Sequence, residues 1–293
     1  MDIVARIDHA LQAALAAHAA PDGPPRLTAA LRHAVFPGGA RIRPRLCVAV
    51  AMACGDDQPV LTDAAASAIE LLHCASLVHD DLPCFDDAPV RRGQASVHAA
   101  FGERLAVLTG DALIVLAFQI VAEAAHLAPL RAAGLIGTLA RGVGVPHGIV
   151  AGQAWECEPQ VALRDYHRAK TGALFSAATC AGAEAAGAPS APWLALGDCL
   201  GEAYQVADDI RDVVSNPDAL GKPVGRDLAL GRPSWVSDWG LAASARRFQD
   251  LVERAVESIP PCRGQAALQA LVLVEAERLV PQALCQDLIR EAA

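Results

Sequence analysis

The stretch SLVHDDLPCFDDAPVRRG, residues 76–93, carries four aspartates within eight positions and two arginines soon after them. Apolar residues at helical spacing lead into it. Pro83 predicts that this helix ends near Asp81 and that Asp86 returns from a loop. Because carboxylates this close repel one another, the stretch indicates a site that binds cations at the end of a helix.

The composition predicts a large helical core. The chain has 293 residues, of which 53% are hydrophobic and 19% charged, far from the composition of a disordered chain. Alanine and leucine dominate, no long strand-like alternation occurs, and prolines punctuate the chain at helix-sized intervals. We therefore expect an all-α protein of about ten or more helices, folded as a single domain over residues 1–293.

Charge and cysteine usage exclude several classes of function. The net charge of −9 leaves no global basic field for nucleic acid, so we expect no nucleic-acid partner. No uncharged apolar run reaches the roughly 18 residues of a membrane span, and the amino terminus lacks a basic signal region. The nine cysteines form no CxxC pair. They predict reduced, mostly buried thiols in a cytoplasmic protein, and they make a zinc site improbable.

A second aspartate motif, YQVADDIRD, follows at residues 204–212. Asp208 and Asp212 stand four residues apart and so share one helix face. One acidic pair alone is ordinarily solvated surface. Here two clusters each follow an apolar helix and each precede a cationic motif, a pattern that suits magnesium, which takes a few carboxylates and completes its octahedron with water and phosphate oxygens. Two such clusters facing a cavity predict a diphosphate site.

The lysines give an independent indication. Only Lys170 and Lys222 occur among 24 basic residues, and they lie in the short segments KTGALF and GKPVGRD. Lysine offers a compact point charge for phosphate, whereas arginine offers a planar fork. The retention of lysine at these two places favours phosphate binding there.

Taken in order, the two aspartate motifs, PGGARIRP, RRG, KTG and GKPVGRDLALGRPS resemble those of a trans-isoprenyl diphosphate synthase, from about Leu31 to Trp235. A class I terpene cyclase would share only the first aspartate cluster. The resemblance implies an isoprenoid synthase fold, with helices around a central apolar cavity, and a homodimer. It also implies head-to-tail condensation of isopentenyl diphosphate with an allylic diphosphate (dimethylallyl, geranyl or farnesyl).

The resemblance assigns roles to individual residues, taken position by position. It makes Asp80, Asp86 and Asp208 magnesium ligands, with Asp212 as a further or supporting ligand and Asp81 and Asp209 in supporting roles. About three magnesium ions per active site are implied. The allylic diphosphate is assigned to Arg91, Lys170, Lys222 and Arg232, the last standing where the family usually has lysine. Two side chains, Thr171 and Gln205, are assigned to point oxygen dipoles at the carbocation.

The isopentenyl diphosphate site departs from the family pattern. The resemblance assigns it Arg43, His73 and Arg92, although a lone histidine on an apolar helix is more often a core residue. The family's turn lysine is replaced by Ala40, and Arg41 or Arg45 could supply the missing charge. This departure leaves open a non-catalytic partner subunit of a heteromeric synthase. The complete set of metal-ligand aspartates favours an active enzyme.

Side chains before the first aspartates set the expected product length. One helical turn is about 5.4 Å, on the order of one extended isoprene unit. Ala75 and Ser76 are small, and Leu72 and Phe118 are candidate lower stops. The resemblance, closest to bacterial synthases that feed carotenoid biosynthesis, implies geranylgeranyl diphosphate as product, with farnesyl diphosphate as the alternative. Ala75 could instead simply pack against a neighbouring helix.

Two further acidic residues are weaker candidates. Asp111 lies inside an apolar helix, where a buried acid needs a partner, and we expect a structural pairing near the active site. Glu156 stands where the family often has aspartate after GQ, and Gln153 is a candidate cavity residue.

Overall fold

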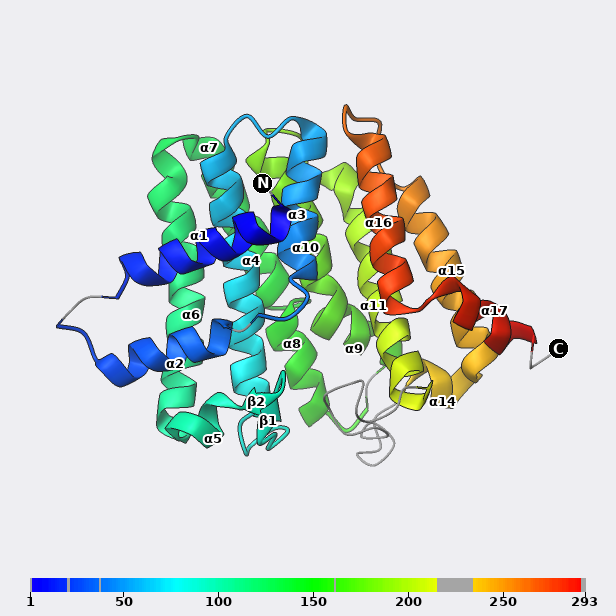
Figure 1. The fold of residues 1–293 in the computed structure, drawn as a ribbon, viewed down its shortest axis with the longest axis horizontal. Helices are drawn as coiled ribbons and strands as arrows, with labels where there is room; N and C mark the ends of the chain where they lie inside the picture. Colours follow the sequence, from blue (N-terminus) through cyan, green and yellow to red (C-terminus); the bar gives the residue numbers. More distant parts are fainter. Residues whose placement is uncertain (1, 20–21, 37, 161, 215–233, 291–293) are drawn as a thin grey trace. The chain divides into compact units, whose positions relative to one another are not determined.

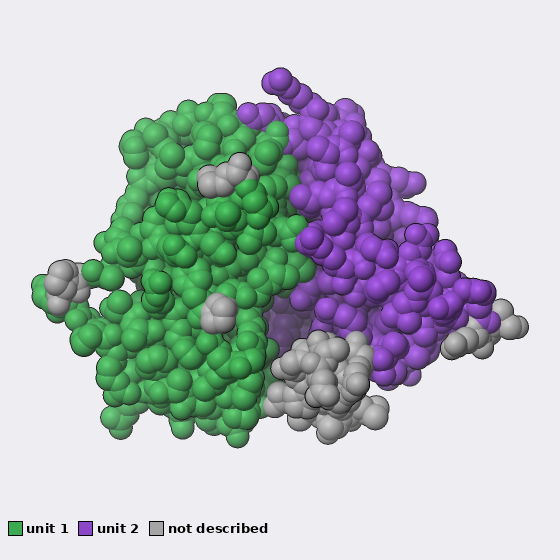
Figure 2. Space-filling model, viewed as in Figure 1, with its two compact units in different colours: residues 1–52, 56–139, 181–188 green, residues 53–55, 140–180, 189–293 purple. Residues whose placement is uncertain are grey.

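The computed structural model describes residues 2–19, 22–36, 38–160, 162–214 and 234–290. Helices dominate these ranges, and the described strands form a single two-stranded hairpin (Figure 1). The chain divides into two compact units, coloured separately in Figure 2: unit 1 holds residues 1–52, 56–139 and 181–188, and unit 2 holds 53–55, 140–180 and 189–293. The all-α prediction is confirmed, whereas the single domain over 1–293 stays a prediction.

Unit 1 is built around one long apolar helix, α4, against which α6, α1 and α2 pack (Figure 1). Small alanines alternate with leucine and isoleucine along α4, so neighbouring helices approach it closely. The elements that lie in this unit, wholly or in part, are α1 (Ile3–Ala17), α2 (Pro25–Val35), α3 (Ile42–Cys54), α4 (Pro59–Asp80), β1 (Val90–Arg91), β2 (Gln94–Ala95), α5 (Val97–Phe101), α6 (Glu103–Glu123), η1 (Ala124–His126) and α7 (Pro129–Val143).

Unit 2 is built around α11, which packs against α15 and against a π-helical turn, η3. Its core includes Val206, Ile210 and Phe248. The elements of this unit are α8 (Ile149–Ala154), η2 (Trp155–Cys157), α9 (Leu163–His167), η3 (Arg168–Gly172), α10 (Ala173–Ala185, ending in unit 1), η4 (Ala191–Trp193), α11 (Leu194–Val214), α14 (Trp235–Trp239), α15 (Leu241–Glu257), α16 (Gln265–Leu279) and α17 (Gln282–Arg290).

Prolines start helices as the sequence predicts. Pro25, Pro59 and Pro129 are the first residues of α2, α4 and α7. Proline suits the first helical position because its missing N–H has no intrahelical partner there and its φ is already helical. The prediction that α4 ends near Asp81 is also confirmed, since the helix ends at Asp80.

Two helical segments, α4 and residues 103–126, are long and apolar enough to cross a membrane by length and composition alone. In the apolar 18-residue stretch of α4, 67% is buried inside the fold. In the corresponding stretch of the second segment, 44% is buried. The burial of α4 identifies it as a core helix. The second segment instead exposes Val107, Leu108 and Val115 on one face.

Candidate active site

The first aspartate motif forms a turn directly after α4. The Asp86 N–H donates to the Asp80 carbonyl over 2.9 Å, and the Ala88 N–H donates to the Asp81 carbonyl over 3.1 Å. These bonds fold the chain back, so that Asp86 returns from a loop as predicted. The side chains of Asp80 and Asp86 keep part of their surface accessible, whereas Asp81 is buried.

The buried Asp81 is held by Arg91 from the β1 strand. The Arg91 Nε donates to both carboxylate oxygens, at 2.9 and 3.2 Å, and a terminal guanidinium nitrogen also contacts Asp81. Burial raises the pKa of the Asp81 carboxyl, and Arg91 only partly offsets this. The same guanidinium lies 4.0 Å from the Asp80 carboxylate. Arg91 therefore links the hairpin to the first aspartate motif in this structure.

The three residues assigned to isopentenyl diphosphate come together in unit 1. The His73 Nε2 atom lies 3.5 Å from an Arg43 guanidinium nitrogen and 3.3 Å from one of Arg92. Burial, followed by the nearby arginines, lowers the pKa of His73 well below its usual value. The ring is therefore neutral, and its Nε2 lone pair faces the two guanidinium groups.

The turn preceding α3 decides which arginine is available to a ligand. Arg41 adopts a φ of 52° and turns into the protein, where its Nη1 donates to Glu70 over 2.6 Å. It also contacts Asp8 and the Val35 carbonyl. Gly38 makes room for this guanidinium, because a Cβ there would lie 2.2 Å from the Arg41 Cζ. The suggestion that Arg41 replaces the missing turn lysine is therefore wrong, since its donors are used inside the core.

In unit 2, Glu156 gathers three donors around one carboxylate. Lys170 and Tyr166 each donate to its Oε1 over 2.5 Å, and Gln153 donates to its Oε2 over 3.1 Å. Lys170 belongs to the π-helical turn η3, which the sequence did not reveal. Such turns are rare inside helices and are frequent at functional sites. Gly152 permits α8 to lie close to η3, because a Cβ at this position would lie 2.3 Å from the backbone nitrogen of Lys170.

A second hydrogen-bonded group in unit 2 joins the other predicted residues of the KTG and DDIRD motifs. The Thr171 hydroxyl donates to the Gln205 Oε1 over 2.9 Å, and the Gln205 Nε2 donates to the Asp209 Oδ1 over 2.9 Å. The backbone N–H of Trp235 donates to the second carboxylate oxygen of Asp209 over 2.8 Å. The link to Trp235, at the start of α14, was not visible in the sequence.

The remaining aspartates of the second motif lie on α11, as their spacing predicts. The half-buried Asp208 accepts from Arg211 over 3.1 Å, and Asp212 is buried. Two further residues assigned to the allylic diphosphate, Lys222 and Arg232, lie outside the described residues. The structure therefore places Asp208 and Asp212 on one helix.

The four candidates for setting product length lie on the packed pair α4 and α6 (Figure 1). Ala75 and Leu72 are buried, at 1% and 2% exposure. Ser76 and Phe118 keep part of their surface, and the Ser76 hydroxyl donates to the His73 carbonyl over 2.8 Å. Ser76 therefore shares the half-exposed stripe of α4 with His73 and Asp80, while Ala75 faces the packed interior.

The prediction for Asp111 was partly wrong. Its side chain is 60% exposed rather than buried, and it lies 3.8 Å from the His79 ring. The pairing next to Asp80 agrees with the expected structural role. Gly110 allows the approach of the two helices, because a Cβ there would lie 2.0 Å from the His79 Nε2.

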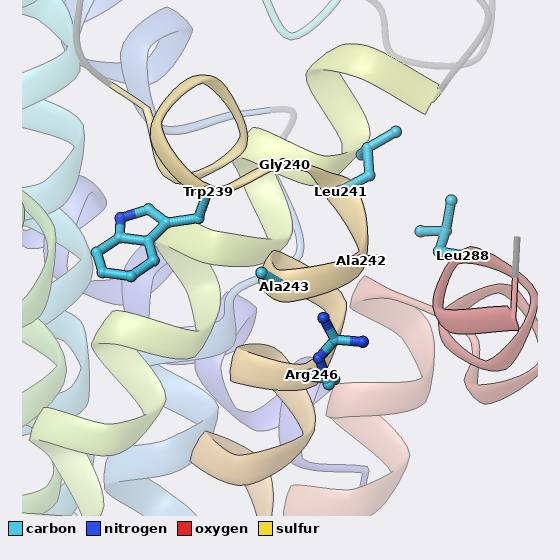
Figure 3. Close-up of a pocket in the computed structure, with 7 residues that line it drawn as sticks. All are labelled: Trp239, Gly240, Leu241, Ala242, Ala243, Arg246 and Leu288. Atoms are coloured by element: carbon cyan, nitrogen blue, oxygen red, sulfur yellow. The ribbon is translucent and has the colours of Figure 1, made fainter. Parts of the chain in front are cut away.

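A groove on the carboxyl-terminal helices α14, α15 and α17 is shown in Figure 3. Its lining residues are Trp239, Gly240, Leu241, Ala242, Ala243, Arg246 and Leu288. None of the residues predicted from the motifs lines this groove. It belongs to the part of the chain for which the sequence indicates no chemistry.

Comparison with known proteins decides the family. The model of the polyprenyl synthetase family matches residues 24–265. This protein belongs to the polyprenyl synthetase family. The geranylgeranyl diphosphate synthase of Cereibacter sphaeroides is 54% identical over 276 residues, covering 94% of this chain and 96% of that protein. The synthase of the same name from Rhodobacter capsulatus is 50% identical, covering 96% and 97%.

Solved structures agree with this assignment. The geranyltransferase of Helicobacter pylori, complexed with magnesium and isoprenyl diphosphate, matches with a TM-score of 0.82 and 29% identity, covering 94% of this chain and 96% of that one. As a polyprenyl synthetase, the protein is a prenyltransferase with the isoprenoid synthase fold. The predictions of fold, family and enzyme class are confirmed.

The aspartates fit the magnesium that the family generally uses. Within the described ranges, no group of three or more His, Cys, Asp and Glu side chains could hold a metal ion alone. Magnesium does not need such a cage, because it binds one or two carboxylates and completes its shell with water and substrate phosphate. Asp80, Asp86 and Asp208 offer hard oxygen donors whose side chains remain partly accessible.

Proposed function

We propose that this prenyltransferase condenses isopentenyl diphosphate with allylic diphosphates to make geranylgeranyl diphosphate. The observation that carries the proposal is the 54% identity, over nearly the whole of both chains, to the geranylgeranyl diphosphate synthase of Cereibacter sphaeroides. Relatives this similar over this length ordinarily share their reaction. The first aspartate motif and the Arg43, His73 and Arg92 cluster provide the corresponding chemistry in unit 1.

Ionisation of the allylic C–O bond puts negative charge on the departing diphosphate. Magnesium, about three ions per active site, neutralises that charge when bound. We assign Asp80, Asp86, Asp208 and Asp212 as its ligands. Asp81 has a supporting role: its hydrogen bonds to Arg91 fix the turn that presents Asp80 and Asp86.

Four cations hold the allylic diphosphate in this proposal: Arg91, Lys170, Lys222 and Arg232. The structure supports a specific behaviour for Lys170. Its ammonium is paired with Glu156, in a cluster that also includes Tyr166 and Gln153. The Glu156 partner already orders the lysine side chain. A diphosphate oxygen that binds Lys170 therefore replaces an existing partner, and less side-chain entropy is lost on binding.

Isopentenyl diphosphate binds at Arg43, His73 and Arg92. Two guanidinium groups supply charge-assisted hydrogen bonds to phosphate oxygens. The neutral His73 accepts from them and aligns them without adding a third charge, because its pKa is lowered by its surroundings. Ala40 is exposed at the turn and contributes no cation, so the turn itself offers the homoallylic diphosphate one charge fewer than the family pattern.

Carbon–carbon bond formation leaves a tertiary cation that must lose a proton. A diphosphate oxygen of the leaving group accepts it, so no side-chain base is needed. The growing chain extends beside α4 along the half-exposed stripe that carries Ser76, where the neighbouring buried Ala75 adds no bulk, and Leu72 or Phe118 stops growth. Small residues at this level favour geranylgeranyl over farnesyl diphosphate.

The active protein is a homodimer in the cytoplasm. Val107, Leu108 and Val115 form an exposed apolar face on α6, at 42%, 52% and 63% exposure. A second copy covering this face would remove it from water. All nine cysteines are free, which fits a reducing compartment.

Product analysis tests the proposal. The purified protein is incubated with magnesium, labelled isopentenyl diphosphate and, separately, dimethylallyl, geranyl or farnesyl diphosphate, and the dephosphorylated products are separated by chromatography. We expect geranylgeraniol from all three primers and none after EDTA. Farnesol as the final product would replace the proposal with a farnesyl diphosphate synthase. No turnover by the protein alone would favour a partner subunit.

A further inference from the structure

The hydrogen bonds around Gln205 have a defined polarity. Ordinarily the oxygen and nitrogen of a glutamine amide cannot be told apart without their hydrogen-bond partners. Here one partner is the Asp209 carboxylate, which accepts hydrogen bonds and cannot donate them. The amide nitrogen must therefore face Asp209, at 2.9 Å, and the amide oxygen must face Thr171, also at 2.9 Å.

The polarity of the amide fixes the Thr171 hydroxyl. The Gln205 oxygen can only accept, so the Thr171 hydroxyl hydrogen points at Gln205. The lone pairs of the Thr171 oxygen then point away from Gln205. Both side chains keep part of their surface accessible, so the negative end of the hydroxyl dipole is presented outside this pair.

The carboxylate that sets this polarity is itself anchored. Asp209 is 3% exposed, and its second oxygen accepts the Trp235 N–H over 2.8 Å. The helix α11 also lies tightly against the π-helical turn that carries Thr171. A Cβ at Gly201 would lie 2.6 Å from the Gly172 Cα, so the backbones approach closely. Thr171 on one side, and Gln205 and Asp209 on the other, therefore lie on backbone segments that pack closely together.

We propose that Asp209 and Gln205 are positioning residues that fix the Thr171 hydroxyl dipole, with its oxygen toward the allylic carbon that becomes positive. The inference rests on the proposed prenyl transfer. A dipole oriented before the reaction stabilises developing charge without reorganising in the transition state. Gln205 acts through Thr171, because its oxygen accepts the Thr171 hydroxyl and so sets the direction of that hydroxyl, and this refines the expectation that Gln205 faces the carbocation directly.

Asp209→Asn reverses the polarity without changing the shape. The Trp235 N–H still needs an acceptor, so the new amide turns its oxygen to Trp235 and its NH₂ to Gln205. Gln205 must then flip, its own NH₂ faces Thr171, and the hydroxyl hydrogen points outward. We expect kcat with farnesyl diphosphate to fall about a hundredfold, the size of effect that follows loss of one preorganised dipole. The allylic KM should change much less.

A double-mutant cycle with Thr171→Val separates this role from a structural one. If Asp209 acts through the Thr171 hydroxyl, Asp209→Asn adds little in the Thr171→Val background, and Thr171→Ser retains most of the activity of the unmodified protein. Asp198→Asn is the matched control, because Asp198 is a carboxylate on the same helix that accepts the Ser176 hydroxyl over 2.5 Å outside this group. It should retain wild-type kcat.

Three results would overturn the inference: unchanged kcat in Asp209→Asn, additive losses in the cycle, or an apparent magnesium activation constant that rises in step with the loss of kcat. The last result would make Asp209 a metal ligand. If Asp209→Asn does not fold, the cycle of Gln205→Leu with Thr171→Val gives the same decision. Absence of prenyl product from the unmodified protein would overturn the proposed function itself, whereas turnover with an additive cycle would overturn only this inference.

Discussion

The buried ion pair between Arg41 and Glu70 offers a quantitative test of the unit 1 core. Their closest charged atoms lie 2.6 Å apart, and the side chains are 1% and 2% exposed. Removing one member of such a pair leaves a buried charge without its partner and typically costs about 3–5 kcal/mol. Glu70→Gln retains the shape and leaves Arg41 with the partly exposed Asp8 as its remaining carboxylate, so we expect a loss of about 3 kcal/mol, at the lower end of that range.

Urea denaturation followed by circular dichroism measures this loss. The exposed pair of Arg131 and Asp57 is the matched control, because it has the same 2.6 Å separation but side chains that are 30% and 57% exposed. Asp57→Asn should scarcely change the midpoint, since solvent screens exposed pairs. The double variant Arg41→Met with Glu70→Leu should recover most of the stability lost by Glu70→Gln. Equal effects of Glu70→Gln and Asp57→Asn would refute the argument that burial controls the energy.

Further predictions concern substrate affinity, product length and pH. Ala40→Lys should lower the KM for isopentenyl diphosphate by about fivefold, the value of one added charge-assisted contact; an unchanged KM, measured at saturating farnesyl diphosphate, would mean that another cation already fills the site. Ala75→Phe should shorten the product by one isoprene unit or more, and an unchanged product in a folded variant would show that the chain does not pass this residue. Burial, and then Lys170, lower the pKa of His167 from 6.5 to about 4. As the pH falls, the unfolded state therefore takes up the His167 proton before the folded state does. The free energy of unfolding that is present above pH 6.5 decreases as the pH falls toward 4, and the loss is about 2 kcal/mol at pH 5. Urea unfolding at pH 7.5 and 5 should show that His167→Gln escapes this loss, and an equal loss in both proteins would contradict the assignment.

The sequence predicted those features that depend on local rules. Pro83 and the aspartate spacing placed the end of α4 correctly, and the four-residue spacing of Asp208 and Asp212 placed both on one helix. These predictions need only the steric effect of proline and the period of a helix. The grouping of Arg43, His73 and Arg92 came from the family resemblance, because contacts between residues 19 and 30 positions apart carry no local signal.

The features that the sequence did not reveal depend on tertiary packing. Whether Arg41 reaches a ligand or the core is decided by its positive φ and by Glu70 on another helix. The π-helical turn around Lys170 depends on its packing against α8 and α11. Asp111 was expected to be buried because its neighbours are apolar, but that face of α6 is exposed within the chain. Apolar neighbours along a helix do not reveal which face another element covers.

The most direct test of the account is the effect of Asp80→Asn on the chemical step. This change removes a proposed magnesium ligand and leaves the Arg43, His73 and Arg92 cluster intact. We predict that kcat for elongation of farnesyl diphosphate falls at least about a hundredfold at saturating magnesium, while binding of isopentenyl diphosphate, measured by calorimetry, stays the same. Near-wild-type kcat would contradict the claim that metal held by Asp80 draws the diphosphate away from the allylic carbon.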